Sequence, residues 1–130
     1  MTLRTAWLWC GWAFVVLVIF LSLNTEPVDV GRIDEVKAGH FLAYGWLVLW
    51  FSQVYRSLSA RAAWAIGFSL MGVALEYAQG MTGYRTFAYA DMRDNLLGAG
   101  MGLALSWTPL GNILAAVENR FGKVRFRGAA

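Results

Sequence analysis

The stretch Thr5–Leu23, TAWLWCGWAFVVLVIFLSL, carries no charged side chain and decides how the chain must fold. An α-helix rises about 1.5 Å per residue, so about 20 apolar residues cross the roughly 30 Å hydrocarbon core of a bilayer. Arg4 precedes the stretch as in a signal peptide, but no small-residue cleavage site follows it. The sequence therefore predicts a retained membrane-spanning helix over residues 5–23.

Three further apolar runs are close to the length of a membrane span. They cover Ala38–Tyr55, Ala62–Ala78 and roughly Asn95–Val117. Pro109 lies inside the last run, and proline interrupts helical hydrogen bonding. This run is therefore either one kinked span or a short span followed by a helix at the inner surface. The apolar residues after the proline have the spacing of a surface helix, at Leu110, Ile113, Leu114, Val117 and Phe121.

Composition supports a membrane protein of one domain, residues 1–130. Hydrophobic residues make up 58% and charged residues 15%, against about 25% charged in soluble domains. The aromatic content of 15% excludes a disordered chain, and a single cysteine excludes a disulfide scaffold. We predict an all-α polytopic bundle of four transmembrane helices, with the fourth kinked or broken at Pro109. The predicted helices cover about residues 5–23, 37–56, 62–79 and 91–117, and a basic tail covers 118–130.

The distribution of charge predicts the orientation. One set of loops and ends holds a single acid, Glu118, among many basic residues, whereas the other set mixes both signs. The basic set is Arg4, Arg56, Arg61, Arg120, Lys123, Arg125 and Arg127. Basic loops remain cytoplasmic, so we predict a multi-pass membrane protein with both termini in the cytoplasm. The basic tail is expected to lie against anionic lipid headgroups, and not to bind nucleic acid.

Polar side chains share one face on each of three predicted helices. The sets are Lys37, His40 and Tyr44 on the second helix; Gly72, Glu76 and Gln79 on the third; and Asp91, Asn95, Gly98 and Gly102 on the fourth. The helical rise places the three sets about 6–12 Å below the outer face of the bilayer. Polar residues at such depth are costly and often functional. The sequence therefore predicts a polar layer in the outer leaflet.

Glu76 is the most costly member of this layer. A carboxylate inside a membrane must be protonated, hydrated or paired, and the candidate partners are Arg85, Lys37 and His40. Asp91 is placed to act as the N-cap or first-turn acid of the fourth helix. A purely structural interpretation of the layer, as hydrogen bonds between helices, also remains open.

The remaining motifs concern packing and chemistry. Gly98 and Gly102 form a small-xxx-small pair, which lets another backbone approach closely. No nucleophile elbow, zinc motif or phosphate-binding loop is present in the sequence. The single histidine argues against a metal site. We therefore expect no metal and no cofactor.

Three segments together resemble the signature of the VanZ-like family of small integral membrane proteins. Lys37–Tyr44 resembles the pattern K-x-x-H-F-x-x-Y, and Glu76–Gln79 resembles E-x-x-Q. Arg85–Gly102 resembles the segment R…D…N…GA…G. One departure is Val36, where the family often has Asp directly before the lysine. The match covers Lys37 to Gly102 with the motifs in the family's order.

The resemblance implies a cell-envelope protein of the bacterial inner membrane, since the family is named for a determinant that lowers sensitivity to the glycopeptide teicoplanin. Such a protein would bind a lipid headgroup or a lipid-linked cell-wall precursor in the outer-leaflet site. The alternatives are a small membrane enzyme, with His40 and either Glu76 or Asp91 as acid and base, and a structural subunit of a homo- or hetero-oligomer with Gly98 and Gly102 at the contact. The candidate site residues are Lys37, His40, Tyr44, Glu76, Gln79, Arg85, Asp91 and Asn95, and the packing candidates are Gly72, Gly98 and Gly102.

Overall fold

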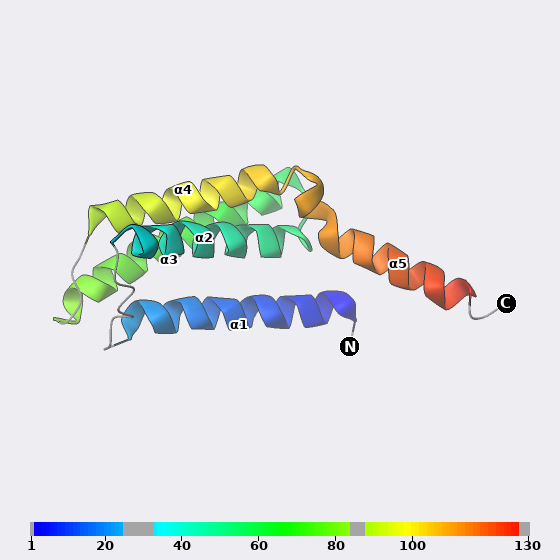
Figure 1. The fold of residues 1–130 in the computed structure, drawn as a ribbon, viewed down its shortest axis with the longest axis horizontal. Coiled ribbons are helices and arrows are strands. Elements are labelled where there is room, and N and C mark those ends of the chain that lie inside the picture. The colour runs from blue at the N-terminus through cyan, green and yellow to red at the C-terminus, as the bar shows by residue number, and fades with distance from the viewer. Residues whose placement is uncertain (1, 25–32, 84–87, 128–130) are drawn as a thin grey trace.

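A computed structural model describes residues 2–24, 33–83 and 88–127, with side chains for all of these except 33–38 and 122–127. Every regular element in these ranges is helical, which confirms the all-α class. The elements are α1 (Leu3–Leu23), α2 (Ile33–Ser52), α3 (Leu58–Met81), α4 (Tyr89–Leu105), the 3-10 turn η1 (Pro109–Asn112) and α5 (Ile113–Arg127) (Figure 1).

Two of these helices, α1 and α3, are long and apolar enough to cross a membrane. The pair formed by α4 with η1 and α5 passes the same test as a third span if it is counted as one broken element, bent by 73°. The described residues thus confirm a helical chain suited to a membrane. The count of four spans stays a prediction.

Helices α1 to α4 lie alongside one another, and α5 extends away from the end of α4 (Figure 1). The end of α1, the start of α2, the end of α3 and the start of α4 share one end of the bundle, which we call the α4-start end. The start of α1, the end of α2 and η1 lie at the opposite end, which we call the α5 end. Residues far apart in the sequence therefore meet at each end.

Helices α2 and α4 pack at backbone distance. A Cβ atom placed on Gly98 would overlap the carbonyl oxygen of Phe41, and one placed on Gly102 would overlap that of Gly45. The two pairs have the same separation of 57 positions (98 − 41 and 102 − 45), so the helices run parallel in one register. The close approach expected at Gly98 and Gly102 is thus made with α2 of the same chain. This glycine face is filled, and it is not free to contact a partner subunit.

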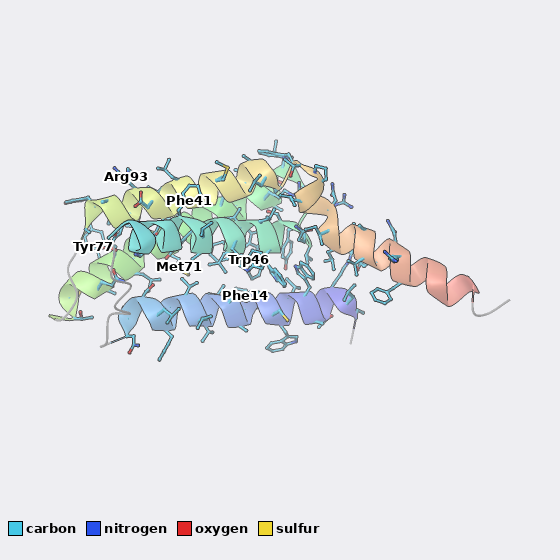
Figure 2. All side chains as sticks on the ribbon, viewed as in Figure 1. Phe14, Phe41, Trp46, Met71, Tyr77 and Arg93 are labelled. Carbon is cyan, nitrogen blue, oxygen red and sulfur yellow. The ribbon has the colours of Figure 1, made fainter. Side chains whose placement is uncertain are left out.

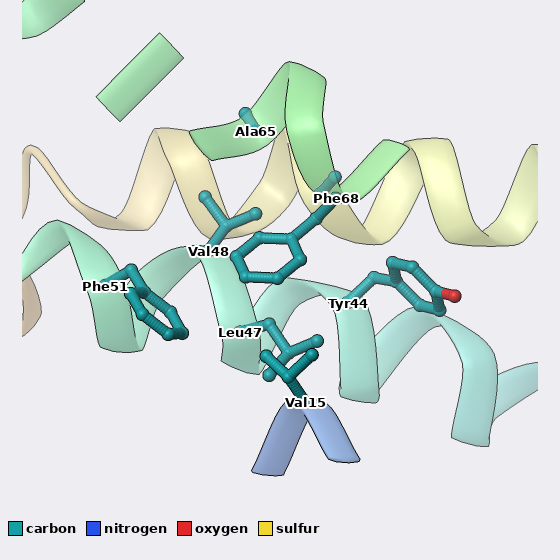
Figure 3. Packing of buried hydrophobic residues seen from close by; sticks show 8 residues of the cluster. Val15, Tyr44, Leu47, Val48, Phe51, Ala65 and Phe68 are labelled. Atoms are coloured by element: carbon teal, nitrogen blue, oxygen red, sulfur yellow. The ribbon is translucent and has the colours of Figure 1, made fainter. Parts of the chain in front are cut away.

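Helix α2 holds the centre of the bundle. Leu47, Val48 and Phe51 of α2 are fully buried, and they pack with residues of α1 and α3 (Figure 3). Helix α1 is fastened to α2 by an aromatic pair. The indole Nε1 of Trp7 donates to the carbonyl of Trp50 at 3.0 Å, and that of Trp50 donates to the carbonyl of Trp7 at 2.8 Å.

The two rings of that pair stack, with centroids 4.0 Å apart. Further along α1, Phe14 meets Trp46 of α2 edge to face (Figure 2). Aromatic pairs of this kind contribute about 0.5–1.5 kcal/mol beyond the area they bury. Helix α1 is therefore attached to α2 through side chains, whereas α2 and α4 are in direct backbone contact.

Helix α4 ends at Leu105, so the stretch predicted over about residues 91–117 is broken and not one continuous helix. The Ser106 hydroxyl donates to the carbonyl of Leu103, and the Thr108 hydroxyl to that of Leu105, both at 2.6 Å. Pro109 follows at the start of η1 and supplies no N–H to continue α4. The predicted break at Pro109 is therefore present, and α5 takes a new direction.

Other predicted boundaries also moved. Helix α2 begins at Ile33 and ends at Ser52, and α3 begins at Leu58. The Ser57 hydroxyl accepts from the N–H of Ala60, which caps the start of α3. Much of the tail predicted from residue 118 belongs to α5, which continues to Arg127. A capping side chain, and not the limit of the apolar run, therefore marks where α3 begins.

Arg61 was expected in a cytoplasmic loop, but it is buried at the α5 end. Its Nη1 donates to the carbonyl of Ser106 at 2.7 Å, and its Nε and Nη2 donate to that of Ser52 at 3.3 and 3.2 Å. The last carbonyls of a helix have no partner within the helix, and the C-terminal end of the helix dipole attracts a cation. Arg61 therefore joins the ends of α2 and α4.

We expect Arg61→Met to lower the free energy of unfolding by about 2–4 kcal/mol, because it leaves buried carbonyls without donors. Arg61→Lys keeps the charge and part of the hydrogen bonding, so its loss should be about half as large. Thermal unfolding of the purified protein in detergent measures both. Equal stability of Arg61→Met and the wild type would contradict this role.

The glycines of α4 offer a matched pair for testing the contact with α2. Gly98→Ala should lower the free energy of unfolding by about 1–3 kcal/mol through overpacking. A Cβ on Gly100 meets nothing within 4 Å, so Gly100→Ala should be neutral or stabilise by up to about 1 kcal/mol through helix propensity. Unfolding in detergent compares the two variants, and an equal effect of both would count against the backbone contact.

Candidate functional site

The described polar candidates lie together at the α4-start end. His40 lies near the start of α2, Glu76 and Gln79 near the end of α3, and Asp91 and Asn95 in the first two turns of α4. The alternating directions of the helices bring these termini to one level (Figure 1). The side chain of Lys37 and the whole of Arg85 lie outside the described residues.

His40 contacts two side chains of α4. Its Nδ1 is 3.0 Å from Oδ1 of Asn95, and its Nε2 is 3.8 Å from Oδ2 of Asp91. An amide oxygen only accepts hydrogen bonds, so with this assignment of the Asn95 amide Nδ1 carries a hydrogen. Nε2 then faces the carboxylate, where it can take up a proton. Asp91 and Asn95 are four residues apart and so share the face of α4 that holds the ring.

His40 and Asp91 are the accessible members of this group, with 17% and 22% of their side chains exposed. Asn95 and Tyr44 behind them are buried. A Cβ on Gly72 would lie 3.0 Å from both Nδ2 of Asn95 and Cε1 of Tyr44. The missing side chain of Gly72 thus makes room for both, and α2, α3 and α4 meet at this point.

Glu76 is buried and is engaged by the backbone of the next helix. Its Oε1 accepts from the N–H of Ala88 at 2.6 Å. Ala88 is the N-cap of α4, whose positive dipole end favours a nearby carboxylate. Asp91 lies in the first turn of the same helix, which confirms the first-turn alternative, and Ala88 takes the N-cap position. Two acids therefore stabilise the start of α4 from different helices.

Gln79 is buried but belongs to a different contact. Its Nε2 donates to the carbonyl of Ser22 at 2.7 Å, near the end of α1. It therefore fastens α1 to α3 and makes no described contact with His40, Asp91 or Asn95. Helical spacing predicted that Gln79 shares a face with Glu76, but spacing does not show which neighbouring helix a side chain contacts.

Asp94 is the residue that the sequence reasoning missed as a site candidate. It is only 8% exposed, and its Oδ1 pairs with the guanidinium of Arg93 at 3.2 Å. Arg93 itself is exposed on the outer side of α4 (Figure 2). Oδ2 of Asp94 has no hydrogen-bond partner among the described residues. Its position one turn before Gly98, on the glycine face, was the available signal.

The chemistry of the described site is that of two oxygen acceptors, from Asp91 and Asn95, beside one imidazole. Three carboxylates, from Glu76, Asp91 and Asp94, lie near the start of α4 with His40. Within the part of the chain that the structure describes, no three His, Cys, Asp or Glu side chains come close enough to hold a metal ion. The arrangement can accept hydrogen bonds from hydroxyl or ammonium groups, and it can exchange a proton at Nε2 of His40.

The geometry of His40 makes a spectroscopic prediction. The chain has one histidine, so the spectrum of isotope-labelled histidine reports His40 alone. At a pH where the ring is neutral, we expect ¹⁵N NMR to show the hydrogen mainly on Nδ1. Asn95→Leu should abolish this preference, whereas Gln79→Leu should leave it intact. A wild-type ring protonated mainly on Nε2 would contradict the hydrogen bond to Asn95.

Comparison of the chain with protein-family models, curated proteins and solved structures gives no match. The function is therefore argued from the residues and their contacts.

Proposed function

We propose that this chain is a VanZ-like protein of the bacterial cell envelope that binds the polar headgroup of an outer-leaflet lipid or a lipid-linked cell-wall precursor. The observation that carries the proposal is the group formed by His40, Asp91 and Asn95, in which buried Asn95 contacts the partly exposed His40 and the partly exposed Asp91 lies beside the same ring. Binding there would change the access of a glycopeptide such as teicoplanin to the cell surface. The similarity of Lys37–Tyr44, Glu76–Gln79 and Arg85–Gly102 to the family signature supports the assignment.

The proposed topology has four spans with both termini in the cytoplasm of the inner membrane. Arg4 of α1 and Glu118 of α5 form an ion pair at 3.0 Å, so the N-terminus and α5 lie at the same end. This end carries the basic excess, which favours the cytoplasmic side. Helix α2 packs against α1, α3 and α4, and its 20 residues rise by about 30 Å, which suits a span despite its polar start. The α4-start end then lies in the outer leaflet.

The roles of the site residues follow from their exposure. Asp91 and His40 would contact the ligand, with the Asp91 carboxylate accepting from a hydroxyl or ammonium group. Asn95 would orient the imidazole through Nδ1, and Glu76 would hold the start of α4 through Ala88. Lys37 and Arg85, the cations expected from the sequence, would bind a phosphate of the same headgroup.

A substitution series on the purified chain in lipid nanodiscs tests this function. Asp91→Asn should weaken binding of a lipid-linked cell-wall precursor about tenfold or more, because a hydrogen bond to a charged group is worth about 1.5–3 kcal/mol. Arg85→Glu should abolish binding, while His40→Gln, which keeps a hydrogen-bonding group, should have a small effect. Arg93→Gln, an exposed cation at the same end, is the control.

Expression of the same variants in bacteria links binding to phenotype, with teicoplanin sensitivity as the measurement. The change in sensitivity should follow the order of binding loss. A chain that retains full binding with Arg85→Glu and loses it with His40→Gln would overturn the proposal.

The geometry also favours one second candidate, a small enzyme acting on a lipid headgroup. A hydrogen bond at one imidazole nitrogen orients the ring so that the other nitrogen can act as a general acid or base. Asp91, at 3.8 Å from Nε2, is the better partner of the two that were considered. Glu76 is occupied by the N–H of Ala88.

Turnover separates the enzyme from the binding protein. The enzyme predicts that purified chain consumes an outer-leaflet lipid and that His40→Gln removes turnover while binding persists. Lack of turnover on outer-leaflet lipids by a folded chain would remove this candidate and leave binding.

A further inference from the structure

A groove lies at the bend between α4 and α5, at the end of the bundle opposite the candidate site. Its volume is about 760 Å³. Its lining includes Trp107, Pro109, Ile113, Ala116, Val117 and Arg120. One wall therefore comes from the connection after α4, and the other from a stripe along α5.

The groove is held open by contacts that fix α5 to the bundle. The Nε2 of Gln53 donates to the carbonyl of Leu110 at 2.7 Å, and its Oε1 accepts from the N–H of Leu114 at 3.3 Å. The guanidinium of Arg56 donates to Oδ1 of Asn112 at 2.8 Å. Such contacts from α2 and the connection after it fix the first turn of α5, so the groove is formed before any ligand arrives.

Opposite faces of α5 have different neighbours. Leu114 is buried, and Glu118, one turn later, pairs with Arg4 of α1. This face points to the bundle. Ala116 and Arg120, four residues apart, belong to the other face and line the groove. The acid of α5 is thus neutralised within the chain, while Arg120 makes no hydrogen bond or ion pair with any residue that the structure describes.

The lining combines the two chemistries of a phospholipid. Trp107 and Ile113 are exposed apolar side chains, at 56% and 43%, and tryptophan is typical of the interface between hydrocarbon and headgroups. Arg120 presents a planar fork of donors that matches a phosphate. The sequence adds three more cations after it, at Lys123, Arg125 and Arg127. Positive charge beside an apolar wall favours an anionic amphiphile.

We infer that this groove binds one anionic phospholipid of the cytoplasmic leaflet, with its phosphate at Arg120 and its acyl chain along Trp107 and Ile113. The inference relies on the orientation proposed above and is independent of the outer-leaflet site. Helix α5 then lies in the plane of the inner membrane surface, where its basic residues bind anionic headgroups. A bound lipid would brace the bend between α4 and α5.

Native mass spectrometry of the full chain in detergent tests the inference, with phosphatidylglycerol and phosphatidylcholine as probes. Phosphatidylglycerol should be retained with the higher affinity. Arg120→Gln should weaken it about fivefold, which corresponds to about 1 kcal/mol for one basic residue near an anionic lipid. Arg93→Gln removes the same charge at the other end and should leave the affinity unchanged. Equal binding of the two lipids would overturn the inference.

A second pair of variants separates the groove from general attraction to basic residues. Ala116→Trp fills the groove without a change of charge and should weaken the binding of phosphatidylglycerol about tenfold. Asn119→Trp places the same bulk on α5 outside the lining and should bind as the wild type. Unchanged affinity in Ala116→Trp would show that charge alone attracts the lipid and would overturn the site. If Ala116→Trp fails to fold, the comparison of Arg120→Gln with Arg93→Gln decides.

Discussion

At Gly98 and Gly102, helix α4 comes so close to the α2 backbone that a Cβ atom does not fit between them. This contact leaves α2 and α4 only one arrangement, parallel and with a constant offset along the chain. Because the register is set in the middle, the contacts at both ends follow from it. His40 meets Asn95 at one end, and the carbonyls of Ser52 and Ser106 converge on Arg61 at the other.

The ends of the bundle use charge in opposite ways. At the α4-start end, Glu76 accepts from the N–H of Ala88, where the helix dipole is positive. At the α5 end, Arg61 donates to carbonyls where the dipoles of α2 and α4 are negative. Both are buried ionisable side chains that hydrogen-bond to backbone groups at helix ends, where those groups have no partner within the helix. Glu76 and Arg61 therefore stabilise the bundle, whereas the more accessible His40 and Asp91 are the residues to which the proposed function assigns the ligand.

Much of the candidate site could be predicted from helical spacing, because residues three, four and seven apart share a face in any helix. Spacing brought His40, Asp91 and Asn95 into one hypothesis, and the structure places them in contact. Spacing could not exclude Gln79 from this group, because one face of a helix can contact several neighbouring helices. In the structure the Gln79 side chain donates to the carbonyl of Ser22 of α1. Asp94 was passed over because it reads as a charged residue of a loop or helix start. Its burial depends on the helix beside it.

The amino-acid sequence by itself determined that the chain is helical and apolar enough for a membrane, that the chain breaks at Pro109, and that small residues allow a close approach at Gly98 and Gly102. These properties depend on local chemistry: hydropathy, the missing N–H of proline and the missing Cβ of glycine. Only the tertiary structure decided that α2 fills the glycine face, that Arg61 is a buried joint and not a loop cation, and that α5 turns away by 73°. Those outcomes depend on which helix surfaces pack against one another. Such contacts join segments that are distant in the sequence, so the local chemistry of one helix does not determine them.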